Sequence, residues 1–107
     1  MLYKFKSKAA GDVIMTAPVG DRILRLIGRE PAPKGIFLPE QMPDLVARLI
    51  AAIEAEEARR RELEKEAEAE GRTLPVGEGI SLRQRAWPLI EMMRRAQAAD
   101  KDIVWGV

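Results

Sequence analysis

The sequence feature that most constrains the fold is an apolar stripe that ends abruptly at Ile53. At 3.6 residues per turn, one helical face collects the aliphatic side chains Met42, Leu45, Val46, Leu49, Ile50 and Ile53. Beyond Ile53 the same face carries mainly Glu and Arg, which favour helix but cannot bury it. We therefore expect one helix over about residues 39–70. Its first half packs on the body, and its charged half, residues 54–70, protrudes into solvent.

Opposite charges along the charged half are spaced to pair within the helix. The expected pairs are Glu56–Arg60, Glu57–Arg61, Arg60–Glu64 and Glu62–Lys65, each worth about 0.2–0.5 kcal/mol. Because these carboxylates alternate with arginines on an exposed helix, they do not form the rigid pocket that a metal ion needs. We expect no metal site in this stretch.

Two further helices are predicted, over about residues 16–28 and 81–98. The first begins at Thr16, a favourable N-cap residue, and ends at Gly28, which suits a left-handed C-terminal position. The second begins with a capping box formed by Ser81 and Gln84. Pro88 inside this helix removes one hydrogen bond, so a kink is expected there.

Both ends of the chain have strand-like patterns. Residues 2–7 alternate between apolar and basic side chains, and residues 102–107 are rich in β-branched and aromatic ones. Since termini of small domains often lie close together, we expect these segments to pair. Gly11-Asp12 is interpreted as a turn, and residues 13–15 fit either a strand or the start of a helix.

Loops are expected over residues 29–38, where Pro31, Pro33 and Gly35 oppose regular structure, and from Gly71 to Gly79. The pair Ile36-Phe37 is expected to pack back onto the domain. The fold class is therefore α+β and predominantly helical, with three helices and a small sheet from the two terminal strands. Residues 1–107 form a single small domain.

The composition excludes several classes of function. The 107 residues contain no histidine and no cysteine, and the net charge is +1. Without histidine, the chain lacks the usual proton shuttle at neutral pH. Without cysteine, it lacks a thiolate nucleophile and a soft metal ligand. We recognise no catalytic constellation, so we expect neither an enzyme nor a bound cofactor. Without a signal peptide or an apolar run of membrane-spanning length, the expected location is the cytoplasm.

Trp87 is the most informative candidate site residue. On a helical wheel it lies beside Arg83, Glu91 and Arg94, away from the apolar face. Exposed there, it would anchor a protein partner. Alternatively, the kink at Pro88 turns the ring into the core, where large aromatic side chains are usually found. The leading functional interpretation is a non-enzymatic protein-interaction or adaptor module whose partner is unknown.

The second functional interpretation is weak binding of nucleic acid or another anionic ligand. The basic residues available for it are Arg85 and Arg95 on the last helix and Lys4 and Lys6 on the first strand. Such binding requires several of them to converge. A pI of about 8.1 is only weakly basic.

Taken together, three stretches carry a family resemblance. They are KFKSKAAGDVIM (residues 4–15), IGREPAPKGI (27–36) and residues 80–107, which begin with ISLRQRAWPLI and end with VWGV. They resemble a family of small uncharacterised bacterial proteins, a domain of unknown function. The resemblance covers nearly the whole chain and implies a single-domain protein, but no activity, ligand or catalytic residue.

Overall fold

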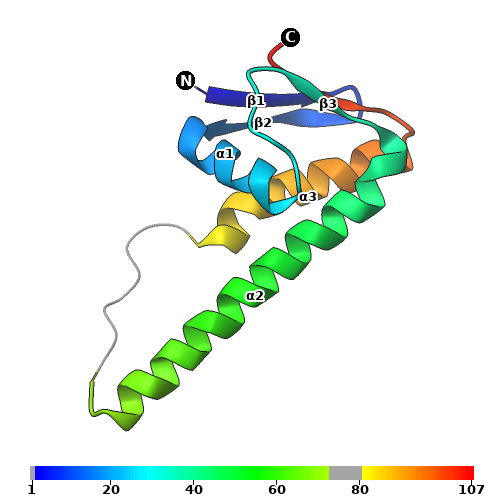
Figure 1. Ribbon diagram of the computed structural model, residues 1–107. Helices are drawn as coiled ribbons and strands as arrows, with labels where there is room; N and C mark the ends of the chain where they lie inside the picture. The colour runs from blue at the N-terminus through cyan, green and yellow to red at the C-terminus, as the bar shows by residue number, and fades with distance from the viewer. Residues whose placement is uncertain (1, 73–80) are drawn as a thin grey trace.

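The computed structural model describes residues 2–72 and 81–107. A four-stranded sheet lies on one side of the molecule and the helices lie on the other (Figure 1). The loop expected between Gly71 and Gly79 lies outside the described residues from position 73 onward. Among the described residues, no helix is long and apolar enough to cross a membrane. The fold is α+β and mainly helical, as predicted.

The sheet combines the two ends of the chain, as predicted. Its strands, in the order β2-β1-β4-β3, are β2 (Ala10–Thr16), β1 (Leu2–Ser7), β4 (Ile103–Trp105) and β3 (Gly35–Phe37). Every neighbouring pair is antiparallel. Lys6 of β1 lies opposite Val104 of β4, so the first and last strands occupy the centre of the sheet.

Residues 13–15 are part of a strand, and the interpretation of Gly11-Asp12 as a turn was wrong. The chain reverses at residues 8–9, where the Ser7 hydroxyl accepts a hydrogen bond from the Ala9 N–H at 3.2 Å. This hydroxyl stabilises a tight turn three residues earlier than expected. Ala10 can then pair with Ser7, and the strand continues to Thr16, with one register shift between the pairs Ser7–Ala10 and Phe5–Val13.

The loop expected over residues 29–38 contains a short strand, so that prediction was wrong in part. Strand β3 pairs with β4, and Gly35 lies opposite Trp105. A Cβ atom on Gly35 would lie 2.2 Å from Cζ2 of Trp105, so the absence of a side chain lets the indole ring pack there. Phe37 is buried as expected, but Ile36 is 39% exposed on the outer face.

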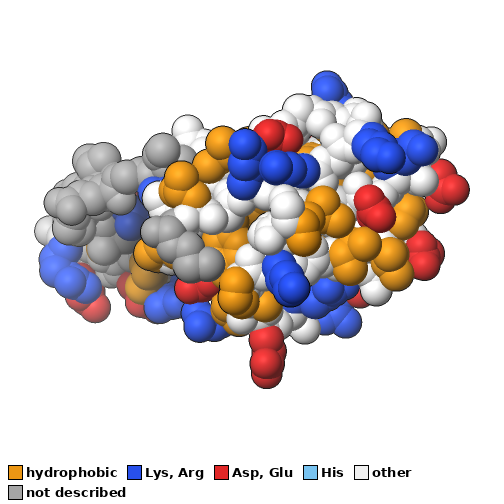
Figure 2. Space-filling model, turned by 90° about the horizontal axis from the view of Figure 1, so that it is seen from above, with side chains coloured by type: hydrophobic (Ala, Val, Ile, Leu, Met, Phe, Trp, Pro, Cys, Tyr) orange, Lys and Arg blue, Asp and Glu red, His pale blue; other side chains and the backbone are white. Residues whose placement is uncertain are grey.

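The outer face of the sheet is not covered by any described helix. The alternation of β1 places Tyr3 and Phe5 inward and Lys4 and Lys6 outward. Figure 2 looks down on this side of the molecule, where hydrophobic and charged side chains are intermixed. Leu2 and Ile14 are the most exposed large apolar side chains of the sheet, at 63% and 57%.

The helices agree with the sequence prediction to within a few residues. They are α1 (Ala17–Leu26), α2 (Met42–Ala69), preceded by the short 3₁₀ helix η1 (Pro39–Gln41), and α3 (Leu82–Ala98). The capping box is confirmed, because the Gln84 N–H donates to the Ser81 hydroxyl and the Ser81 N–H donates to the Gln84 side chain. Gly28 has a φ of 81°, as expected after α1. Thr16 occupies the N-cap position without a side-chain capping bond.

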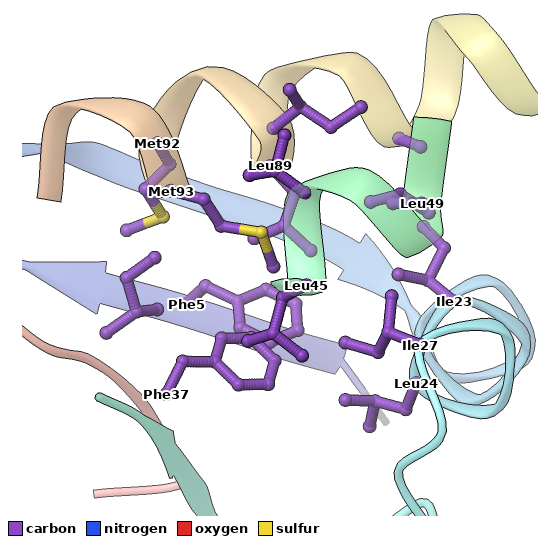
Figure 3. Packing of buried hydrophobic residues seen from close by; sticks show 14 of the residues in the cluster. Phe5, Ile23, Leu24, Ile27, Phe37, Leu45, Leu49, Leu89, Met92 and Met93 are labelled. Carbon is purple, nitrogen blue, oxygen red and sulfur yellow. The ribbon is translucent and has the colours of Figure 1, made fainter. Parts of the chain in front are cut away.

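The core lies between the inner face of the sheet and the helices. Phe5 and Phe37 stack with ring centroids 6.0 Å apart, and Figure 3 shows Leu45 of α2 beside them. Met92 and Met93 approach from α3, and Ile23, Leu24 and Ile27 enclose the other end (Figure 3). The side chains that α3 buries are Leu82, Ala86, Leu89, Ile90, Met92, Met93 and Ala96.

The charged half of α2 extends away from the body (Figure 1). Its ion pairs differ from the prediction at the base of the extension. Glu56 pairs with Arg22 of α1, and Glu57 pairs with Arg83 of α3. These two longer-range partners were not predicted, whereas the predicted pair Arg60–Glu64 is confirmed at 3.1 Å. Ala67 is buried, although it lies in the half expected to be solvated.

Candidate functional site

Helix α3 brings Arg83, Trp87 and Arg94 together on one face. The guanidinium carbon atoms of Arg83 and Arg94 lie 5.4 and 5.5 Å from the centroid of the Trp87 ring. At these distances both cations interact favourably with the π system of the indole. The spacing i, i+4, i+11 repeats with the helical period, so this arrangement follows directly from the sequence.

A bidentate ion pair fixes Arg83. Its Nε and Nη2 atoms donate to the two carboxylate oxygens of Glu57, at 2.9 and 2.8 Å. These hydrogen bonds lower the pKa of Glu57 below its usual range, and they raise the pKa of Arg83. The pair joins the start of α3 to the middle of α2. It therefore holds one of the two cations in place beside Trp87.

The sequence left open whether Trp87 is an exposed anchor or part of the core, and the structure shows features of both. The side chain is half-buried and packs against the edge of the core. Helix α3 continues through Pro88, which is itself exposed. Since Pro88 has no N–H, it cannot donate to the carbonyl oxygen of Gln84 four residues earlier.

An open groove runs beside Trp87, between α3 and β2. One part has a volume of about 470 Å³ and reaches from Ala10 and Gly11 to Arg95. The adjoining part has a volume of about 450 Å³ and reaches from Ile14 and Thr16 to Arg85. The two parts adjoin at Val13, Gln84 and Pro88, which line both of them, and we call them together the α3–β2 groove.

The floor of the α3–β2 groove is largely apolar, and its charges lie toward its ends. Val13, Pro88 and Met92 contribute apolar surface, and Trp87 lies at the side. Arg95 lies toward one end and Arg85 toward the other, with Glu91 between them along the helix. Asp12 of β2 pairs with Lys4 across the sheet at 3.6 Å. Among the charged residues that line the groove, Arg85 and Arg95 are therefore balanced by Glu91 and Asp12.

The four residues considered for anion binding do not converge at one point. Arg85 and Arg95 lie about 15 Å apart along α3, from the rise of 1.5 Å per residue. Lys4 and Lys6 lie on the outer face of the sheet, whereas α3 packs against its inner side. The arginines therefore line a groove, and the lysines belong to a different surface.

The contribution of β2 to this site was missed at the sequence level. Gly11 and Val13 line the groove, but the sequence left residues 13–15 undecided between strand and helix. Once Met15 is placed inward opposite Tyr3, the alternation of the strand assigns Val13 to the same face. Pro88 was interpreted only as a source of a kink, and its exposure in the groove was not anticipated.

The shifted pKa values belong to Tyr3, Glu57 and Arg83. Burial, followed by the hydrogen bond to Asp21, raises the pKa of Tyr3 to about 12, and the Tyr3 hydroxyl lies on the inner side of β1 near α1. Glu57 and Arg83 pair with each other between α2 and α3. Within residues 2–72 and 81–107, no group of three acidic side chains is positioned to hold a metal ion.

The architecture is that of a small α+β domain with an open groove between α3 and β2. The chain belongs to the family described as domain of unknown function DUF1840, whose family model matches residues 1–105. This match confirms the family resemblance seen in the sequence. No curated protein and no solved structure matched the chain.

Proposed function

We propose that this protein is a non-enzymatic interaction module that binds a partner protein through Trp87 and the adjoining α3–β2 groove. The observation that carries the proposal is the half-exposed indole, which is held by Arg83 and Arg94 at the side of an apolar groove. Trp and Arg are the residues most enriched at the energetic centres of protein interfaces. The bacterial cytoplasm is the setting we propose, from the resemblance of the sequence and its lack of cysteine.

The rigid support of Trp87 favours a binding role. Arg83 is fixed by Glu57, and the indole packs on the core, so little side-chain freedom remains to be lost on association. The groove combines apolar surface with a few charges toward its ends, which is the usual composition of a recognition site.

The test is affinity capture from a lysate of the organism that encodes the protein, with and without nuclease. The bait variants are Trp87→Ala and, as a matched control, Leu63→Ala on the protruding part of α2, where the side chain is 40% exposed. We expect one defined protein to be captured by the wild type and by Leu63→Ala, but not by Trp87→Ala. Capture that survives loss of Trp87 would contradict the proposal, as would capture of nuclease-sensitive material. Nuclease sensitivity would favour the nucleic-acid alternative.

A further inference from the structure

Strand β2 presents an open edge that is suited to pairing with another strand. It is the outermost strand on its side, and within the described residues no strand pairs with its outer edge. It is seven residues long and contains neither proline nor lysine, which often protect such edges. The opposite edge, β3, is only three residues long and follows Pro31 and Pro33. Of the two edges, β2 is therefore the one left available.

Helix α3 would form the floor beneath a strand added to this edge. It packs against β2 on the inner side of the sheet, and its side chains Gln84, Pro88 and Met92 line the groove there. A strand placed beside β2 would gain backbone hydrogen bonds and would direct every second side chain toward α3. The central inward side chain would meet Val13 and Pro88, which are apolar.

The charges along the groove match the length of a short strand. Arg95 lines the groove with Ala10 and Gly11, whereas Arg85 lines it with Met15 and Thr16. Their separation of about 15 Å along α3 corresponds to between four and five residues of extended chain, at about 3.4 Å each. Inward positions recur every two residues, so acidic side chains four positions apart would reach both arginines. Glu91 between them disfavours an acidic residue at the middle position.

We propose that the α3–β2 groove binds an extended segment of another protein, which adds to the sheet as a fifth strand along β2. The segment carries an acidic residue at each end and an apolar residue midway, in the order acidic-x-apolar-x-acidic. Trp87 contacts the flank of the segment. This inference rests on the proposed interaction function and specifies the chemistry of its partner.

The experiment uses a fluorescently labelled peptide of seven residues, the length of β2. It has glutamate at its second and sixth positions, isoleucine at the centre and threonine elsewhere. A peptide with lysine in place of both glutamates is the matched control. We expect saturable binding of the first peptide, at least about tenfold weaker binding of the second, and loss of affinity as salt rises. Backbone amides of β2 should shift in NMR spectra and exchange more slowly when the peptide is bound.

Charge exchange tests the register. Arg95→Glu and Arg85→Glu should each weaken binding of the diglutamate peptide by about tenfold or more. Two further peptides each carry lysine at only one of the two glutamate positions. Arg95→Glu should restore binding of one of these peptides, and Arg85→Glu should restore binding of the other. The matching of peptide to variant also gives the direction of the bound strand. Arg59→Glu, an exposed charge reversal on α2, is the control variant and should bind like the wild type.

Several results would overturn the inference. These are equal binding of the lysine peptide, amide shifts that avoid β2, or no binding of either peptide by the folded wild-type protein. A free protein that sediments as a dimer and becomes monomeric on Arg95→Glu would show that a second copy occupies the edge instead. If peptide binding fails while lysate capture still requires Trp87, strand pairing is wrong and the interaction function stands. If both fail, both proposals fall.

Discussion

Arg83 and Glu57 are joined by two hydrogen bonds of 2.9 and 2.8 Å, although 26 positions separate them in the sequence. This pair joins α2 to α3, and it holds Arg83 beside Trp87. Both partners are nearly half exposed, so their contribution to folding is modest. The more important consequence is geometric, because one cation beside the indole is held by a residue of another helix.

The first prediction concerns the pH dependence of this pair. The pKa of Glu57 is lower in the folded protein than in the unfolded chain, so its stabilising effect is present above the unfolded pKa and is lost as pH falls through the folded pKa. Glu57→Gln should therefore lower the urea midpoint at neutral pH, and the difference from wild type should shrink in acid. Glu62→Gln on the exposed part of α2 serves as the control. A pH-independent difference for Glu57→Gln would contradict the prediction.

The second prediction concerns Tyr3, the single tyrosine of the chain. Its ring is 3% exposed and its hydroxyl donates to Asp21, and burial is the larger cause of a pKa of about 12 against an ordinary 10.0. Because the folded pKa is raised, the stabilisation is complete below pH 10 and is lost as pH rises toward 12. Ultraviolet absorbance should show tyrosinate forming near pH 12 in the native protein and near pH 10 in urea.

Asp21→Asn provides the comparison for this titration. The substitution removes the negative charge beside the phenol, so the native tyrosinate should form at a lower pH than in the wild type. Circular dichroism recorded in parallel should show whether ionisation and unfolding coincide. A native phenol that titrates at its ordinary value would show that Tyr3 is not buried as described.

The third prediction tests how closely Tyr3 packs on α1. A Cβ atom on Gly20 would lie 2.1 Å from Cδ2 of Tyr3. Replacing Gly by Ala in a helix interior normally stabilises the helix by about 1 kcal/mol. Overpacking of a core costs about 1–3 kcal/mol, and we expect a contact this short to lie at the upper end of that range. Gly20→Ala should therefore lower the free energy of unfolding, although alanine favours helix more than glycine does. Gly11→Ala, where a Cβ meets nothing within 4 Å, should change it by less than about 0.5 kcal/mol.

The fourth prediction concerns the C-terminal strand, which lies between β1 and β3. Ile103 and Trp105 are buried, and the indole N–H of Trp105 donates to the carbonyl oxygen of Ala32 at 3.0 Å. Burial of such side chains is worth about 1.5–3 kcal/mol each. Truncation after Lys101 should therefore remove a large part of the stability, whereas truncation after Trp105 should have little effect. A near-normal melting temperature after the longer truncation would contradict the role of β4.

The sequence predicted the features that local patterns determine. Helix α3 was predicted with its capping box because Ser81 and Gln84 lie within one turn. By contrast, β3 was missed because its three residues become a strand only through pairing with β4 and through the fit of Trp105 over Gly35. Such pairing depends on tertiary contacts rather than on propensity.

In the candidate site, too, the features set by local spacing were predicted, and those formed between distant elements were not. The cluster of Arg83, Trp87 and Arg94 follows from helical spacing, so a helical wheel was enough to find it. Two features arise between elements that are distant in the sequence, namely the ion pair of Arg83 with Glu57 and the groove between α3 and β2. No periodicity within one segment encodes these relationships, and the structure was needed to show them.

The last prediction concerns the accessibility and charge environment of Trp87. The ring is half-buried, so Trp87→Ala should cost about 1–3 kcal/mol, more than a surface change and less than removal of a fully buried aromatic side chain. In a Trp105→Phe background, acrylamide should quench the remaining fluorescence. Iodide should quench it more efficiently than caesium, because Arg83 and Arg94 attract an anion to the ring. Arg94→Gln should reduce this preference. An indole that no quencher reaches would be fully enclosed, and Trp87 would then be part of the core and unable to anchor a partner.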